Sequence, residues 1–228
     1  MERGNFGSKI GAVLASAGSA VGLGNIWRFP TECGSNGGAA FILIYLVCVF
    51  FLAMPVMVAE FVIGRSSHSN VVGSYRVLAP GKPWVVSGFM GVLAGFLVLS
   101  YYSVVAGWTL DYTCESLVGN LMSGSDFGQH FNDFVSSPWR PALFLTVFLL
   151  LTHYVVATGV EKGIERYSKI MMPLLLLIIF VLAAFSLTMP NAMEGLRFLL
   201  TPEFSKVTKD VVISAMGQAF FSLSVGMG

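Results

Sequence analysis

The chain has 228 residues, of which 55% are hydrophobic and 11% are charged, and its formal net charge is +1. A soluble domain carries about 25% charged residues, so this composition excludes an ordinary soluble protein and predicts one that crosses a membrane several times. A net charge near zero argues against nucleic-acid binding. The three cysteines, an odd number without tight spacing, argue against a disulfide framework or a metal site.

Six apolar stretches are long enough to be, or to begin, a membrane span, because crossing needs about 20 apolar residues. They predict five complete membrane helices and the beginning of a sixth in one transmembrane region, 1–228, with no separate domain. The predicted ranges, in chain order, are 9–36, 39–66, 83–118, 140–159, 165–188 and 208–228. Residues 119–138 read as a polar loop without lysine or arginine, and residues 69–78 and 191–200 read as short surface segments.

The first apolar stretch is interrupted between Gly18 and Pro30 by three glycines, one asparagine and one arginine. Each glycine costs a helix about 1 kcal/mol relative to alanine, and hydrocarbon offers no water to a loosened backbone. Such a segment is stable only where its released N–H and C=O groups face a protein cavity or a bound ligand. The sequence therefore predicts a broken helix whose interruption forms a site for an ion and a solute. The alternative is that Gly18 and Gly22 form a small-residue packing face and that Asn25 caps the half-helix beginning there.

The charges between the apolar stretches predict the orientation of the chain. With the N-terminus in the cytoplasm, eight basic residues lie inside and five lie outside, as the positive-inside rule requires. The inside set is Arg3, Lys9, Arg65, Arg76, Lys82, Lys162, Arg166 and Lys169, and the outside set is Arg28, Arg140, Arg197, Lys206 and Lys209. The sequence has no Asn-x-Ser/Thr glycosylation signal, which favours the inner membrane of a bacterium.

Several long motifs occur in one order along the chain. They are Ala17 to Pro30, Asn36-Gly-Gly-Ala-Ala-Phe, Pro55 with Glu60, Lys162-Gly-Ile-Glu-Arg, and Gly217-Gln-Ala-Phe-Phe-Ser-Leu-Ser. With these motifs the chain resembles, from Arg3 to its last residue, the neurotransmitter:sodium symporter family, whose bacterial members mostly carry amino acids. The resemblance implies an all-α integral membrane fold. It comprises the first five-helix repeat of an inverted-repeat bundle and the first half of the sixth helix, with the first helix broken in mid-membrane.

The function that the resemblance implies is sodium-coupled symport of a neutral amino acid by alternating access, and not an enzymatic activity. The chain would be the N-terminal portion of a longer transporter. Its partners would be an amino-acid substrate, the lipid bilayer and the missing C-terminal half, and nucleic acid would not be among them. Two alternatives stay open: a broken-helix transporter driven by protons or carrying another solute, and a half-transporter that does not transport.

Two sodium sites are implied at the break. One would take the Ala20 carbonyl, the Asn25 side-chain oxygen, and the carbonyl and hydroxyl of Ser222. The other would take the carbonyls of Gly18 and Val21. The family completes both sites with residues from later helices. Whether chloride takes part is undecided, and the positions that match its site are Tyr45, Gln218 and Ser222.

A substrate carboxylate is expected against the N–H groups of Leu23 and Gly24, where the outer half-helix begins. Monoamine carriers have an aspartate at the position of Gly22, so the glycine implies a substrate with its own carboxylate. The complete set of implied substrate-binding residues is Ala20, Gly22, Leu23, Gly24, Val98, Tyr102, Phe221, Ser222, Ser224 and Met227.

The resemblance also implies two gates. The inner gate would use Arg3 and Phe6, and the outer gate would use Arg28, Tyr102 and Phe221. For Arg28 the alternative is that the side chain reaches to the lipid headgroups. Glu60 is expected either to accept N–H groups released where the sixth helix unwinds or to be a protonated or solvated acid at a helix end.

Overall fold

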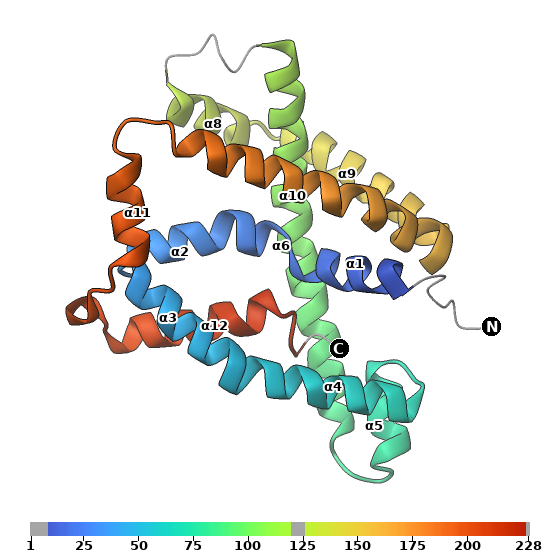
Figure 1. The fold of residues 1–228 in the computed structure, drawn as a ribbon. Coiled ribbons are helices and arrows are strands. Elements are labelled where there is room, and N and C mark those ends of the chain that lie inside the picture. The colour runs from blue at the N-terminus through green and yellow to red at the C-terminus, as the bar shows by residue number, and fades with distance from the viewer. Residues whose placement is uncertain (1–8, 120–125, 227–228) are drawn as a thin grey trace. The chain divides into compact units, whose positions relative to one another are not determined.

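A computed structural model describes residues 9–119 and 126–226, and within these residues every regular element is a helix. The chain divides into two compact units. Their described parts are residues 95–119 with 126–164, and residues 9–94 with 165–226. Helix α6, Val85–Val118, runs from one unit into the other. Figure 1 shows the helices in chain order.

The first apolar stretch forms a broken helix, as predicted. Helix α1, Lys9–Ala20, ends before a bend at Val21 and Gly22. The chain then continues as a π-helical turn, η1 (Gly24–Arg28), and as helix α2 (Phe29–Ser35). A π-helical turn is rare and is found frequently at functional sites. The interruption therefore lies at the glycines that predicted it.

The second stretch is continuous but not uniform, because helix α3 (Ala39–Cys48) passes through a π-helical turn, η2 (Val49–Ala53), into helix α4 (Met54–Ser67). The turn ends two residues before Pro55, whose ring leaves the helix without one N–H donor. Helix α4 ends at His68, in the left-handed region with φ 47°. Helix α5, Val71–Leu78, then begins at Asn70, whose side chain accepts a hydrogen bond from the Gly73 N–H at 2.7 Å.

The core of the larger unit lies between α3 and helix α12, Lys209–Ser222, which Figure 1 shows side by side. Ala215 and Ala219 of α12 are fully buried in two adjoining apolar clusters. Small residues at such a contact allow two helix backbones to approach closely. The contact is how the chain brings α12 to the elements that follow the break.

Helix α1 packs on helix α10, Arg166–Ser186, in the same unit. A Cβ atom on Gly18 would lie 3.4 Å from Sδ of Met172, so Gly18 has the packing role considered as the alternative above. A role of its carbonyl group as a sodium ligand stays a prediction.

The unit of residues 95–164 is built on α6 and helix α9, Arg140–Ala157. The two helices touch at Gly107, where an added Cβ would lie 2.8 Å from the backbone nitrogen of Leu145. Helix α8, Phe127–Ser136, lies within the segment predicted as a loop, and that prediction is wrong there. Asp126 caps α8 by accepting the N–H groups of Gly128 and Gln129 at 2.9 and 3.0 Å.

The remaining elements are a π-helical turn, η3 (Val160–Glu165), helix α11 (Ala192–Leu200) and a 3₁₀ turn, η4 (Phe204–Lys206). Two helices end earlier than predicted because residues in the left-handed region follow them. Gly159, with φ 90°, follows α9, and Ser224, with φ 53°, follows α12. A right-handed helix does not continue through such residues.

Four helical stretches in the described part of the chain are long and apolar enough to cross a membrane, judged by length and composition. They are Ala39–Ser67, Val85–Val118, Arg140–Ala157 and Gly163–Ser186. Their large apolar side chains point outward, and Phe51 and Phe180 are 75% and 73% exposed. An apolar exterior of this kind suits lipid and not water.

Candidate ion and substrate site

The side chain of Asn25 connects the two irregular segments of the larger unit. Its Nδ2 group donates a hydrogen bond to the Ala20 carbonyl at 2.8 Å, across the break. Its Oδ1 atom accepts a hydrogen bond from the Ser222 hydroxyl at 2.9 Å, at the end of α12. Three groups expected in the first sodium site therefore meet in one network. All three offer oxygen atoms, which are the ligands that sodium requires at a broken helix.

Gln218, which is fully buried, extends this network along α12. Its Nε2 group donates to the Gly24 carbonyl at 3.1 Å and to the Ser222 hydroxyl at 3.3 Å. Its Oε1 atom is buried and has no hydrogen-bond partner among the described residues. Gln218 thus fixes the backbone immediately after the break.

One face of α12 carries three side chains that form hydrogen bonds with the first helix. We call this face the polar stripe of α12; it consists of Ser214, Gln218 and Ser222, which follow one another at intervals of four residues. Their partners are Glu32, the Gly24 carbonyl and Asn25, respectively. The stripe joins the sixth helix to the first two residues of η1 and to α2.

Two of the predicted outer-gate residues are in contact. The guanidinium carbon of Arg28 lies 5.3 Å from the centre of the Phe221 ring, a distance at which a cation is attracted to a ring face. Nε of Arg28 also lies 3.6 Å from Oε1 of Glu32. The sequence analysis did not select Glu32, although the spacing of four residues between Arg28 and Glu32 is the signal for an ion pair on a helix.

Tyr102 and Val98 lie four residues apart on α6 and so share one face of that helix. The ring of Tyr102 packs edge-on against Tyr101, with the centroids 6.1 Å apart. Both predicted residues belong to the unit of residues 95–164, and their contact with a substrate stays a prediction. Arg3, Phe6 and Met227 lie outside the described residues.

The three residues that match a chloride site are associated with α3 and α12. Gln218 and Ser222 are hydrogen-bonded to each other, and Tyr45 packs against the cluster that contains Ala219. The Tyr45 ring also meets the Phe29 ring edge-on at 4.8 Å. Chloride binding at these positions stays a prediction.

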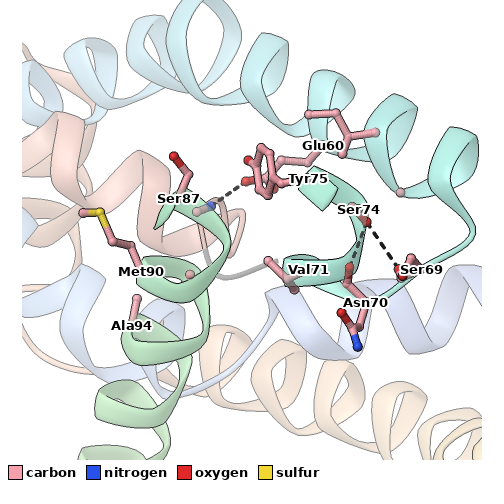
Figure 2. A pocket seen from close by; sticks show the side chains of 13 residues that line it. Glu60, Ser69, Asn70, Val71, Ser74, Tyr75, Ser87, Met90 and Ala94 are labelled. Atoms are coloured by element: carbon pink, nitrogen blue, oxygen red, sulfur yellow. Dashed lines mark hydrogen bonds between the residues drawn. The ribbon is translucent and has the colours of Figure 1, made fainter. Parts of the chain in front are cut away.

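Glu60 is half-buried and contacts the segment that follows α12. Its Oε1 atom accepts a hydrogen bond from the Gly226 N–H at 2.8 Å, which confirms the interpretation that it holds the backbone where the sixth helix unwinds. Beside it is a cavity of about 570 Å³, lined by residues of α4, α5 and the beginning of α6. Figure 2 shows Glu60 at its rim and Ser74 hydrogen-bonded within α5 and the loop before it.

The other unit contains a cluster of charged groups that the sequence analysis did not find. Arg140 donates to Oδ1 of Asp111 at 2.8 Å and also contacts Glu115, and Nε2 of His130 lies 2.9 Å from Oε2 of Glu115. Asp111 is 1% exposed. No group of three or more His, Cys, Asp or Glu residues in the described part of the chain is arranged to hold a metal ion. The cluster therefore serves to join α6, α8 and α9.

A comparison with protein-family models matches residues 3–137 and 126–228 to the sodium:neurotransmitter symporter family. The chain belongs to this family. Its relatives include sodium-dependent transporters, and the family together with the four long apolar helical stretches of the described residues makes the chain a multi-pass membrane protein.

Several members of the symporter family are similar to the chain over nearly its whole length. A sodium-dependent transporter of Bacillus subtilis, YhdH, is 45% identical over 224 residues, which are 97% of this chain and 50% of the relative. The mouse sodium-dependent neutral amino acid transporter B(0)AT2 is 29% identical over all of this chain and 35% of its own length.

The symporter fold itself is shown by a solved structure. The crystal structure of MhsT in complex with L-phenylalanine has 49% sequence identity and a TM-score of 0.92, and the match covers 99% of this chain and 52% of MhsT. This likeness confirms the predicted fold class. The chain spans about half the length of the bacterial relatives that it matches.

Proposed function

We propose that this chain contributes the first part of a symporter that carries a neutral amino acid together with sodium by alternating access. The observation that carries the proposal is the position of Asn25. Its side chain bonds the Ala20 carbonyl on one side and the Ser222 hydroxyl on the other, at 2.8 and 2.9 Å. A network of oxygen atoms at the break of a membrane helix suits an alkali cation.

In this proposal one sodium ion is held by the Ala20 carbonyl, the Asn25 side-chain oxygen, and the hydroxyl and carbonyl of Ser222. A second is held by the carbonyls of Gly18 and Val21 with residues of later helices. Bound sodium supplies positive charge beside the substrate carboxylate, so ion and substrate bind cooperatively. The residues of this chain hold the sodium-binding oxygen atoms in place and keep lipid away from the bound ion.

The proposed substrate is an amino acid with an uncharged side chain. Gly22 brings no carboxylate of its own, and the backbone at Leu23 and Gly24 begins a helical segment whose N-terminus favours an anion. MhsT, at 49% identity, was solved with L-phenylalanine. L-phenylalanine is therefore the first substrate to test, with Val98, Tyr102, Phe221, Ser224 and Met227 as its contacts.

The driving force is adequate for accumulation. One charge crossing 100 mV yields about 2.3 kcal/mol, and a tenfold sodium gradient adds about 1.4 kcal/mol. Two sodium ions would yield about 7 kcal/mol, which is enough for roughly a 10⁵-fold accumulation of substrate. Arg28, Phe221 and Tyr102 would close the site toward the outside, and Arg3 with Phe6 would close it toward the cytoplasm.

The test is uptake of radiolabelled L-phenylalanine into liposomes that contain the protein as its gene encodes it. We expect uptake in sodium and none in potassium at equal pH. Asn25→Ala should weaken the apparent sodium affinity at least tenfold, because it removes one ligand and the bond that positions a second. Asn132→Ala, on the exposed surface of α8, is the matched control and should behave as the parent.

Other outcomes separate the alternatives. Uptake that persists without sodium and follows a proton gradient would contradict sodium coupling. Binding without uptake would identify a protein that does not transport. Replacing chloride by gluconate tests the expected chloride positions Tyr45, Gln218 and Ser222.

A further inference from the structure

The carboxylate of Glu32 lies between the outer gate and α12. Its Oε2 atom accepts hydrogen bonds from the Ser214 hydroxyl at 2.5 Å and from Nδ2 of Asn36 at 3.1 Å. Its Oε1 atom lies 3.6 Å from Nε of Arg28. Glu32 is thus paired with the gate arginine, which lies one helical turn before it in the chain.

The contacts of this carboxylate with Ser214 and with Arg28 differ in strength. The bond from Ser214 has the length of a charge-assisted hydrogen bond, which is about 2.5–2.7 Å between two oxygens. The separation from Arg28 exceeds the usual hydrogen-bond range of about 2.7–3.2 Å, and the side chains of Arg28 and Glu32 are 47% and 26% exposed. The carboxylate is therefore anchored on α12 by a hydrogen bond, whereas Arg28 is held to it by charge attraction without a hydrogen bond.

The guanidinium that Glu32 attracts is also the one that lies over Phe221. Arg28 lies 5.3 Å from the centre of the Phe221 ring and 3.6 Å from the Glu32 carboxylate, so it contacts both side chains. If Arg28 is released from Glu32, the cation loses the contact that keeps it above the ring. A change at Glu32 should then alter how the Phe221 ring is held.

We propose that Glu32 is a positioning residue of the outer gate, which keeps Arg28 over Phe221 and thereby slows the escape of bound substrate to the outside. This inference rests on the proposed function. The resemblance implies no role for Glu32, which lies in α2 and is anchored by Ser214.

The experiment measures the dissociation rate of radiolabelled L-phenylalanine from the purified protein, as its gene encodes it, at constant sodium. Glu32→Gln keeps the size and the hydrogen-bonding capacity of the side chain but removes its charge. We expect dissociation about three- to fivefold faster, the size of effect expected for an exposed ion pair, with the maximal uptake rate within about twofold of the parent. Glu32→Asp should restore part of the slow dissociation. Glu203→Gln, which removes an exposed acid paired with Lys206 at 2.6 Å, is the matched control and should match the parent.

A second readout separates positioning from mere structural support. Added choline chloride should speed dissociation from the parent, because salt screens an exposed ion pair, and should leave Glu32→Gln unchanged. Ser214→Ala keeps the charge but removes the anchor, so it should give a smaller acceleration. The double variant Ser214→Ala/Glu32→Gln should release L-phenylalanine at the same rate as Glu32→Gln alone.

The proposal is overturned if Glu32→Gln releases substrate at the parent's rate, or if salt accelerates both proteins equally. Should Glu32→Gln fail to fold, Ser214→Ala decides, and unchanged dissociation from it overturns the proposal. If the parent protein shows no sodium-dependent binding of L-phenylalanine, the proposed function itself is contradicted. If binding is normal but Glu32→Gln does not change the dissociation rate, only the role of Glu32 is contradicted.

Discussion

At the scale of single residues, Asp111 is a buried acid in a cluster of charged groups. It is 1% exposed, and Arg140 contacts both Asp111 and Glu115, so that its positive charge offsets part of their negative charge. Removing one partner from a buried ion pair leaves an uncompensated charge and costs about 3–5 kcal/mol. We therefore expect Arg140→Gln to lower the thermal unfolding midpoint of the detergent-solubilised protein strongly.

The control for this prediction is Lys206→Gln. Lys206 and Glu203 are also paired, but their side chains are 60% and 56% exposed, so the loss should be within about 1 kcal/mol. A triple variant, Asp111→Asn with Glu115→Gln and Arg140→Met, removes both acids with the base. It should be more stable than Arg140→Gln alone, and a triple variant as unstable as the single one would contradict this account.

At the scale of elements, the crossing of α6 and α9 depends on a missing side chain. A Cβ on Gly107 would lie 2.8 Å from the nitrogen and 3.0 Å from the Cα of Leu145, and backbone atoms cannot move aside as a flexible side chain does. Gly107→Ala should therefore separate the helices and lower the unfolding midpoint. Gly195→Ala, in the interior of α11 with open space around it, should be neutral or stabilising by up to about 1 kcal/mol.

Helix α8 depends on the residue that caps its N-terminus. Asp126 accepts two backbone N–H groups, and replacing such a cap by alanine costs about 1 kcal/mol. Asp126→Ala should therefore speed hydrogen exchange of the first α8 amides about fivefold, measured by mass spectrometry. Asp133→Ala removes the same charge from the exposed surface of α8 and should leave exchange unchanged.

The elements show what a sequence can and cannot predict. Glycines at 18, 22 and 24 predicted the broken helix because their cost in hydrocarbon is high wherever they lie. Helix α8 was missed because a polar segment without lysine or arginine looks like a loop. Its signal was Asp126 followed by Phe127, Phe131 and Phe134, the pattern of a capped amphipathic helix.

The candidate site was predictable only in part for a related reason. Asn25 and Ser222 were selected because they fall within recognisable motifs, and they are in contact. Asp111 was not selected because its partner Arg140 lies 29 positions away. Glu32 has a local signal in Arg28, four residues before it, but its anchor Ser214 lies 182 positions away. Sequence reasoning finds local patterns, whereas such pairs are created by the fold.

At the scale of the whole molecule, the orientation in the membrane is open to a direct test. The distribution of basic residues predicts a cytoplasmic N-terminus. On a Cys114→Ala background, Ser136→Cys should react with a membrane-impermeant maleimide on intact cells, and Lys82→Cys should react only after lysis. Both positions are exposed in the structure, and the reverse pattern would contradict the orientation.

The polar stripe of α12 has a mechanical consequence for the larger unit. Ser214, Gln218 and Ser222 stand above one another on one side of a single cylinder. A turn of that cylinder by one residue, roughly 100°, would carry all three side chains away from their partners simultaneously. The three hydrogen bonds between the two interrupted helices would therefore form or break together when α12 rotates about its axis.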